Sequence, residues 1–184
     1  MKILIAVAFV LGFFALIGAW FAGSYVSAYN YGNAAENQIV ASHKNLNNIL
    51  GQYSTKVAEI AQVPGMYKDD VKETVTAALE GRYGTDGSKA VFQMLKEQNP
   101  TLDSKLYLKI QQVIDGGREE FKNQQTIFID VKRGYTTNLG YLFRGFFLKL
   151  AGYPKIDLTK YDTVTSDYAN EAFKSGVAQP LKLR

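Results

Sequence analysis

The chain opens with an uninterrupted apolar run of twenty residues, Ile3 to Ala22, that carries no charged side chain. As an α-helix this run would be about 30 Å long, which matches the hydrocarbon thickness of a bilayer. A backbone in lipid must satisfy its own hydrogen bonds, so a run of this length is expected to be helical. We therefore predict a transmembrane anchor over residues 1–24, carried by Ile3, Phe9, Phe13, Phe14, Trp20 and Phe21.

The charges on either side of this run predict its orientation. Lys2 and the amino terminus supply positive charge on one side, and the first charge on the other side is Glu36. The positive-inside rule then places the N-terminus in the cytoplasm and the rest of the chain outside it, with Trp20 at the far interface. A cleaved signal peptide is the alternative, because Val26-Ser27-Ala28 is an acceptable cleavage site, but the apolar run exceeds the usual signal length.

Beyond the anchor, apolar positions recur at alternating steps of four and three residues, the pattern of a heptad seam on a helix. The seam residues are Ile39, His43, Leu46, Leu50, Tyr53, Val57 and Ile60. Polar residues occupy the other faces, and no proline separates this helix from the anchor. The helix is expected to end at Val63-Pro64-Gly65, because proline cannot continue it.

A second seam of the same spacing predicts another long helix, with Asn99 as its N-cap and Pro100 as its first residue. Its members are Leu102, Leu106, Ile110, Val113, Gly117, Phe121, Gln124, Phe128, Val131, Tyr135, Asn138 and Leu142. Gly116-Gly117 weakens this helix locally, which is tolerable where another helix packs close. Between the two seams we expect a helix over Lys68–Glu80, a glycine-rich turn, and a short helix capped by Ser88.

Together these patterns predict an all-α protein, in which a transmembrane helix precedes an antiparallel three- or four-helix bundle of long helices. The bundle is assigned to residues 25–154, and residues 155–184 form a tail with a possible short helix over Thr165–Lys174. Tyr53, Tyr135 and Tyr141 are the expected couplings between the two seams.

The lengths of the two helices predict where the second one ends. From Ala22 to Gln62 is about 60 Å of helix, and from Lys105 to Leu148 is about 65 Å. If the helices are antiparallel, the stretch after Tyr141 returns to the bilayer surface, where aromatic and basic side chains are favoured. The residues expected to contact the membrane surface are Phe143, Arg144, Phe146, Phe147 and Lys149. The alternative is that these aromatics close the core of the bundle.

Composition limits the chemistry available to the chain. There is no cysteine and a single histidine, His43, so disulfides, thiolate sites and ordinary metal sites are not expected. From Val131 to Arg184 nine Lys/Arg stand against four Asp/Glu. This excess is too sparse for nucleic-acid binding and better suits an anionic lipid surface.

No set of residues predicts catalysis or a cofactor. Gly81, Gly84 and Gly87 do not have the spacing of a phosphate-binding loop and are interpreted as a turn. Asp69, Asp70 and Glu73 favour the start of a helix rather than a cation site. His43 is interpreted as a core or interface residue. Glu119 and Glu120 have no opposed carboxylate that the sequence identifies.

In layout the chain resembles the LemA family, as a divergent member. The resemblance rests on Tyr29-Asn30 after the apolar run, the seam from Asn45 to Tyr53, Asp69-Asp70-Val71-Lys72-Glu73-Thr74-Val75, the helix from Glu119 through Lys132-Arg133-Gly134-Tyr135, and the stretch from Phe146 to Tyr153. The family's double Tyr-Asn spacing in the last long helix and the Phe-Pro that usually ends that helix are missing here. The resemblance implies one anchor and an exported antiparallel helical domain; it implies no particular activity.

These observations predict a non-enzymatic structural or interaction protein of the cell envelope, whose partners are the bilayer and either an envelope protein or a second copy of itself. One alternative is an envelope enzyme acting on cell-wall or lipid substrates, which requires a polar cleft with carboxylates from Asp115, Glu119, Glu120 and Asp130. Another is a subunit of a larger membrane assembly.

Overall fold

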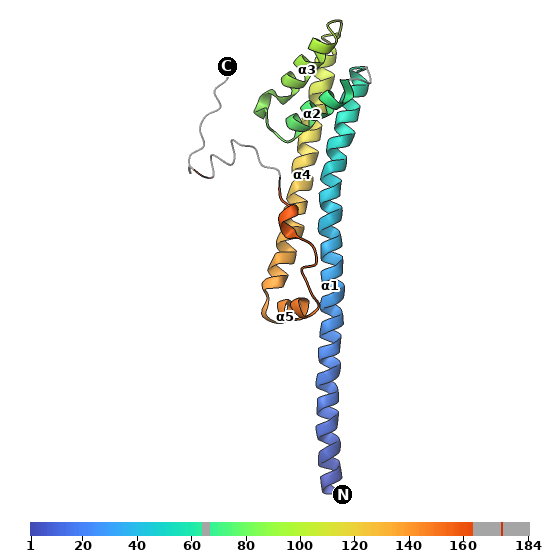
Figure 1. The fold of residues 1–184 in the computed structure, drawn as a ribbon, viewed down its shortest axis with the longest axis vertical. Coiled ribbons are helices and arrows are strands. Elements are labelled where there is room, and N and C mark those ends of the chain that lie inside the picture. Colours follow the sequence, from blue (N-terminus) through green and yellow to red (C-terminus); the bar gives the residue numbers. More distant parts are fainter. Residues whose placement is uncertain (64–66, 164–173, 175–184) are drawn as a thin grey trace. The chain divides into compact units, whose positions relative to one another are not determined.

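The computed structural model describes residues 1–63, 67–163 and 174, and in this part of the chain every regular element is helical (Figure 1). The helices are α1 (Lys2–Ile60), α2 (Lys68–Leu79), α3 (Gly87–Gln98), α4 (Leu106–Gly140) and α5 (Leu142–Leu150), with 3₁₀ turns at Gly84–Asp86 and Leu158–Lys160. The predicted all-α fold, with a long apolar N-terminal helix and bundle-like packing, is confirmed.

The chain divides into two compact units. The first contains Met1–Ala41 and Phe128–Tyr161. The second contains Ser42–Ile127 and the chain from Asp162 onward. Both α1 and α4 contribute a segment to each unit, so the predicted boundary between residues 24 and 25 lies inside the continuous helix α1.

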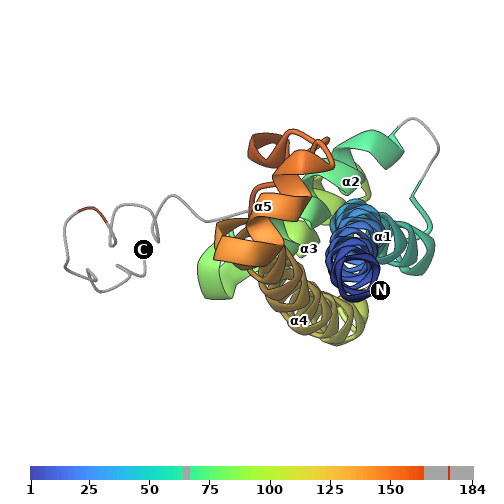
Figure 2. The same ribbon diagram turned by 90° about the horizontal axis from the view of Figure 1, so that it is seen from below.

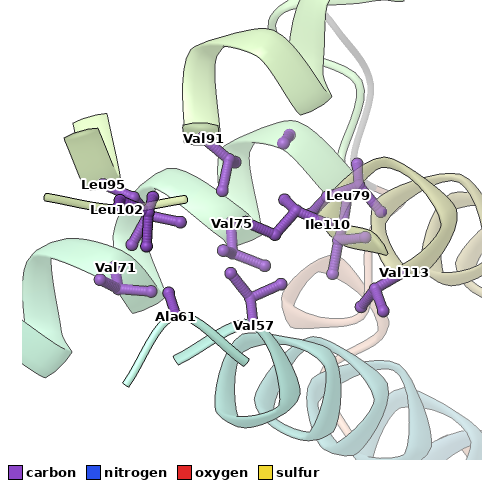
Figure 3. Close-up of a cluster of buried hydrophobic side chains, with 12 residues drawn as sticks. Val57, Ala61, Val71, Val75, Leu79, Val91, Leu95, Leu102, Ile110 and Val113 are labelled. Atoms are coloured by element: carbon purple, nitrogen blue, oxygen red, sulfur yellow. The ribbon is translucent and has the colours of Figure 1, made fainter. Parts of the chain in front are cut away.

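The second unit is a small bundle built around aliphatic side chains from four helical segments (Figure 3). On α2, Val71, Val75 and Ala78 follow a four-three spacing, which places all three on one face, and all are fully buried. The other members of the core are Val57, Ala61, Leu79, Val91, Leu95, Leu102, Ile110, Val113 and Ile114. Burying each of these larger side chains stabilises the fold by about 1.5–3 kcal/mol.

Within this unit α1 and α4 run antiparallel. The amide of Asn45 donates to Gln124 (3.0 Å), and the hydroxyl of Tyr53 donates to Glu120 (2.7 Å). Partner numbers on α4 fall as numbers on α1 rise, which is the antiparallel register. Of the first seam, Ile39, Leu46 and Val57 are buried and the remaining four residues are partly buried.

Three helices end in the same way, with a residue of left-handed backbone conformation and a backbone hydrogen bond spanning five residues. The residues in question are Gln62 (φ 50°), Gly81 (φ 81°) and Gly152 (φ 82°). At the first, the N–H of Val63 donates to the carbonyl of Ala58 (3.0 Å). Helix α1 thus ends at Ile60, slightly before the predicted breaker, of which Pro64 and Gly65 lie outside the described residues.

Two predicted helix starts are wrong. Helix α4 begins at Leu106, because Asn99 is extended (φ −134°, ψ 87°) and the next residues form turns. One turn is closed by the Leu102 N–H on the Asn99 carbonyl, and another by the Lys105 N–H on the Asp103 carboxylate. Helix α3 begins at Gly87, so Ser88 is its buried second residue and not its cap.

The expected continuous helix through Leu142 is also interrupted. Tyr141 is extended (φ −68°, ψ 145°) and separates α4 from α5. A Cβ on Gly145 would collide with the carbonyl oxygen of Leu139, so the glycine permits the close turn between the two helices. Leu142 consequently leaves the seam and is 84% exposed. The possible helix at Thr165–Lys174 lies, except for Lys174, outside the described residues.

Two adjacent glycines of α4 test how closely this helix packs against Tyr53 of α1 and Leu79 of α2. A Cβ on Gly117 would lie 2.6 Å from Leu79 Cδ2 and 2.8 Å from the Tyr53 ring, whereas one on Gly116 meets nothing within 4 Å. We expect Gly116→Ala to raise the free energy of unfolding by about 0.5–1 kcal/mol, because alanine favours helix. Gly117→Ala should lower it by about 1–3 kcal/mol through overpacking. Chemical denaturation in detergent measures both; equal shifts would contradict this packing.

Candidate membrane-interface site

Among the described residues, α1 is the one helix long and apolar enough to cross a membrane. None of its most apolar stretch is buried against the rest of the protein. Figure 1 shows this part of α1 extending beyond α5 with no other segment of its unit beside it. The anchor residues project outward: Ile3 is 81% exposed, Phe9 76%, Phe13 62%, Phe14 64%, Trp20 59% and Phe21 42%. Such exposure suits lipid and not water.

Helix α5 packs against α1 at the point where the apolar run ends. The Phe147 ring is 5% exposed, and its centroid lies 4.9 Å from that of Phe21 and 6.1 Å from that of Trp20 in edge-to-face contacts. Figures 1 and 2 show α5 lying crosswise to α1. The position of α5 along α1 is therefore set by aromatic contacts with the last turns of the apolar run.

Helix α5 has a buried face and an exposed apolar face. Gly145, Phe147 and Leu148 are buried, and this face packs with Ala28 and Tyr153. The exposed apolar side chains are Leu142 (84%), Phe143 (68%), Phe146 (54%) and Leu150 (51%), beside exposed Arg144 and Lys149. The sequence left two interpretations of these aromatics, contact with the membrane surface and closure of a core. Phe147 closes a core on the buried face of α5, whereas Phe143 and Phe146 are exposed on the other face.

The loop after α5 is fastened to α1 by a buried carboxylate, Glu36, which is 6% exposed. Its Oε1 accepts hydrogen bonds from the Tyr135 hydroxyl (2.7 Å) and from the backbone N–H groups of Lys155 (2.7 Å) and Ile156 (3.4 Å). Burial of a carboxylate is favourable only with such donors. Burial of Tyr135, together with its bond to Glu36, raises the pKa of that phenol well above its ordinary value.

Tyr153 completes this attachment. Its hydroxyl donates to the carbonyl of Tyr29 (3.1 Å), and its ring occupies the space where Gly32 has no side chain, since a Cβ there would lie 2.5 Å from Tyr153 Cε2. The Lys155 ammonium lies 4.5 Å from the centroid of the Tyr153 ring and 4.6 Å from that of the Tyr29 ring. Close approach of a ring to a helix backbone explains the need for Gly32.

The sequence identified only part of this attachment. Tyr135 was predicted as a coupling residue and bonds Glu36 on α1, while Tyr141, predicted with it, is 56% exposed. The sequence did not indicate that Glu36 is buried, because a single carboxylate in a helix is usually a surface residue. The available signal was the small-residue series Ala28, Gly32 and Ala35 on one helix face, which indicates a close neighbour.

A groove of about 450 Å³ lies between α1 and α5. It is lined by Trp20, Gly23, Ser24, Ser27, Ala28, Phe143, Arg144 and Phe147. Arg144 is held in place from two sides, by a hydrogen bond from Nη1 to the Asn138 side-chain oxygen (2.9 Å) and by the Tyr31 ring 4.4 Å away.

Of the carboxylates expected for an enzyme, two lie together in the second unit. Asp115 and Glu119 line a polar hollow of about 420 Å³ beside Arg118 and Lys122. The other two lie elsewhere: Glu120 accepts the Tyr53 hydrogen bond, and Asp130 pairs with Arg133 (2.8 Å).

The residues considered for metal binding do not form a site in the described part of the chain. No group of three or more His, Cys, Asp or Glu side chains there is arranged to hold a metal ion. Asp69, Asp70 and Glu73 are exposed on the first turns of α2, and His43 is partly buried.

The two tyrosine–glutamate bonds between α1 and α4 offer a matched comparison. Tyr135 is 1% exposed, whereas the Tyr53–Glu120 bond lies at the surface. We expect Tyr135→Phe to lower the free energy of unfolding by about 1.5–3 kcal/mol, the range for a buried bond to a charged group. Tyr53→Phe should cost less than about 1 kcal/mol. Denaturation at neutral pH measures both, and a larger loss for Tyr53→Phe would contradict the burial of Glu36.

The loss of stability in Tyr135→Phe is also expected to depend on pH. The folded pKa of Tyr135 is raised by burial, so the contribution of its protonated hydroxyl is complete below the ordinary pKa of 10.0 and declines above it. The difference in unfolding free energy between wild type and Tyr135→Phe should therefore narrow from pH 9 to 11. The slope above the unfolded pKa approaches about 1.4 kcal/mol per pH unit. Tyr53, whose pKa is raised mainly by its bond to Glu120, is present in both proteins and cancels.

Comparison of the chain with protein-family models, with curated proteins and with solved structures finds no match. The resemblance to the LemA family therefore stays a prediction from the sequence.

Proposed function

We propose that this protein is a membrane-anchored, non-enzymatic interaction protein of the cell envelope, LemA-like in layout, that displays a helical domain at the membrane surface. The observation that carries the proposal is the packing of α5 crosswise on α1, with Phe147 against Phe21 and Trp20. A helix in this position lies at the level where an apolar span leaves the hydrocarbon. Its exposed phenylalanines then enter the interfacial layer, where an amphipathic helix lies in the membrane plane.

Charge supports an extracytoplasmic domain. Lys2 precedes the apolar run, whereas the first Lys or Arg after the run is Lys44, more than twenty residues beyond Ala22. Because positive charge close to a span is retained in the cytoplasm, this asymmetry favours a cytoplasmic Lys2 and an exported bundle.

Two attachments to one membrane would restrict how the first unit moves. Helix α1 holds it laterally, and α5 resists tilting of the unit, because tilting would lift part of its apolar face out of the interface. Confinement to a surface raises the effective concentration of the domain for other envelope components. In the second unit, α4 exposes Leu108 (65%) and Ile127 (47%), apolar side chains of the kind that a partner helix covers.

The first experiment tests on which side of the membrane the domain lies. Because the chain contains no cysteine, a single introduced cysteine is the only thiol that a maleimide can label. Ser104→Cys places a thiol at an exposed position of the domain, and Ala15→Cys places one in the apolar run. We expect a membrane-impermeant maleimide to label Ser104→Cys in intact cells, while Ala15→Cys stays unlabelled because lipid excludes the reagent. Labelling of Ser104→Cys only after lysis would place the domain in the cytoplasm and overturn the proposed location.

The interaction itself is tested by photo-crosslinking from Leu108 and Ile127 in cells, followed by mass spectrometry. A reproducible adduct with an envelope protein or a second copy is expected from both positions. The adduct from Ile127 should disappear in Leu108→Lys and persist in Asp115→Asn, a residue that is exposed on the same helix. No adduct from either position would contradict the interaction proposal.

The polar hollow around Asp115 and Glu119 favours one second candidate, an envelope enzyme acting on cell-wall or lipid substrates. Loss of cellular function in a variant carrying Asp115→Asn and Glu119→Gln, with unchanged thermal unfolding, would support that candidate. Retained function would support the interaction protein.

A further inference from the structure

The groove between α1 and α5 lies at a definite height relative to the apolar run. At 1.5 Å per residue, Ser24 and Ala28 are about 3 and 9 Å beyond Ala22, the last residue of the run. Lipid headgroups occupy roughly the first 5–8 Å outside the hydrocarbon. If the run spans a bilayer, the groove therefore extends across the headgroup layer, with Trp20 at its inner end and Ala28 at the outer edge of that layer.

The lining of the groove combines an apolar wall with a fixed positive charge. Trp20, Ala28, Phe143 and Phe147 supply apolar surface, and Ser24 and Ser27 supply hydroxyls. Arg144 contributes the charge.

The contacts of the Arg144 guanidinium favour binding of an anion. Asn138 and Tyr31 orient its guanidinium, and because both are neutral they do not cancel its charge. A single N–H of the guanidinium is used on Asn138, which leaves further donors for an outside acceptor. Guanidinium groups match phosphate oxygens in geometry and bind them through paired hydrogen bonds.

We propose that this groove binds one anionic phospholipid, with its phosphate on Arg144 and the upper part of an acyl chain against Trp20 and Phe147. The apolar wall and the height of the groove select a lipid over free phosphate, which has no apolar part. A headgroup without its own cation is preferred, because a choline would bring a positive charge toward the guanidinium. The proposal rests on the membrane anchoring of α1 but on neither the export of the domain nor a protein partner.

The test uses the full-length protein in detergent micelles with equal amounts of phosphatidylglycerol and phosphatidylcholine of the same acyl chains, and native mass spectrometry counts the bound lipid. The wild type is expected to retain one phosphatidylglycerol with about a tenfold preference, equivalent to about 1.4 kcal/mol. Inorganic phosphate should not displace it. Displacement by inorganic phosphate would show a simple anion site and overturn the lipid proposal.

Arg144→Gln tests the charge, and Lys149→Gln is its control. Lys149 is exposed on the same helix and does not line the groove. The preference should disappear in Arg144→Gln and persist in Lys149→Gln. Equal losses in the two variants would show general attraction of lipid to a basic surface and overturn the specific site.

A second pair tests the groove without changing charge. Gly23→Leu fills the groove, and Gly18→Leu places the same side chain on α1 outside it; a Cβ at either glycine meets nothing within 4 Å. We expect Gly23→Leu to lose the bound lipid and Gly18→Leu to keep it. Unchanged binding in Gly23→Leu would place the lipid elsewhere. A protein that fails to enter lipid nanodiscs would refute the membrane span, whereas one that enters but shows no lipid preference would refute only this site.

Discussion

The first unit depends on the burial of one carboxylate. Oε1 of Glu36 accepts hydrogen bonds from the Tyr135 side chain and from the backbone of Lys155, so a single atom of α1 joins α4 to the loop that follows α5. A carboxylate away from water is costly without donors, and the buried Tyr135 hydroxyl would lose its acceptor without Glu36. Glu36 and its donors therefore stabilise one another, and they hold the loop on α1 together with the contacts of Tyr153. Helix α5 leads directly into this loop, so the Glu36 contact supports the position on α1 that the contacts of Phe147 with Trp20 and Phe21 set.

Hydrophobic spacing predicted the helices well, because burial of one face is the main requirement of a bundle. Val57, Ile110, Phe128 and Tyr135 were placed on the seams and are all buried. The errors lie where backbone geometry and not side-chain periodicity decides the structure. Asn99-Pro100 has the residues of a helix start yet forms a turn, and the seam beyond Asn138 continues in spacing although the helix does not.

The candidate site was predicted in part, for a related reason. The composition of residues 141–150 indicated an interfacial segment, and helix lengths indicated that it returns to the end of the apolar run. The sequence could not predict which phenylalanines of the segment are buried and which are exposed, because Phe143, Phe146 and Phe147 are chemically identical. Only the crossing of α5 over α1 buries Phe147 and leaves the other two exposed. The groove and the fixed orientation of Arg144 arise from that crossing, which joins residues more than a hundred positions apart in the chain.

If α1 spans a bilayer and α5 lies at its surface, as proposed, the continuity of α1 through Ala22 has a consequence for the kind of membrane that suits this protein. A span that is longer than its bilayer is thick normally accommodates the mismatch by tilting. Here the span and the α1 segment that holds α5 are one helix without a break. Tilting α1 would lift one end of α5 out of the interface and press the other into the hydrocarbon, which costs free energy at both ends. With that freedom removed, the protein is expected to partition by thickness, favouring bilayers whose apolar core is close to 30 Å.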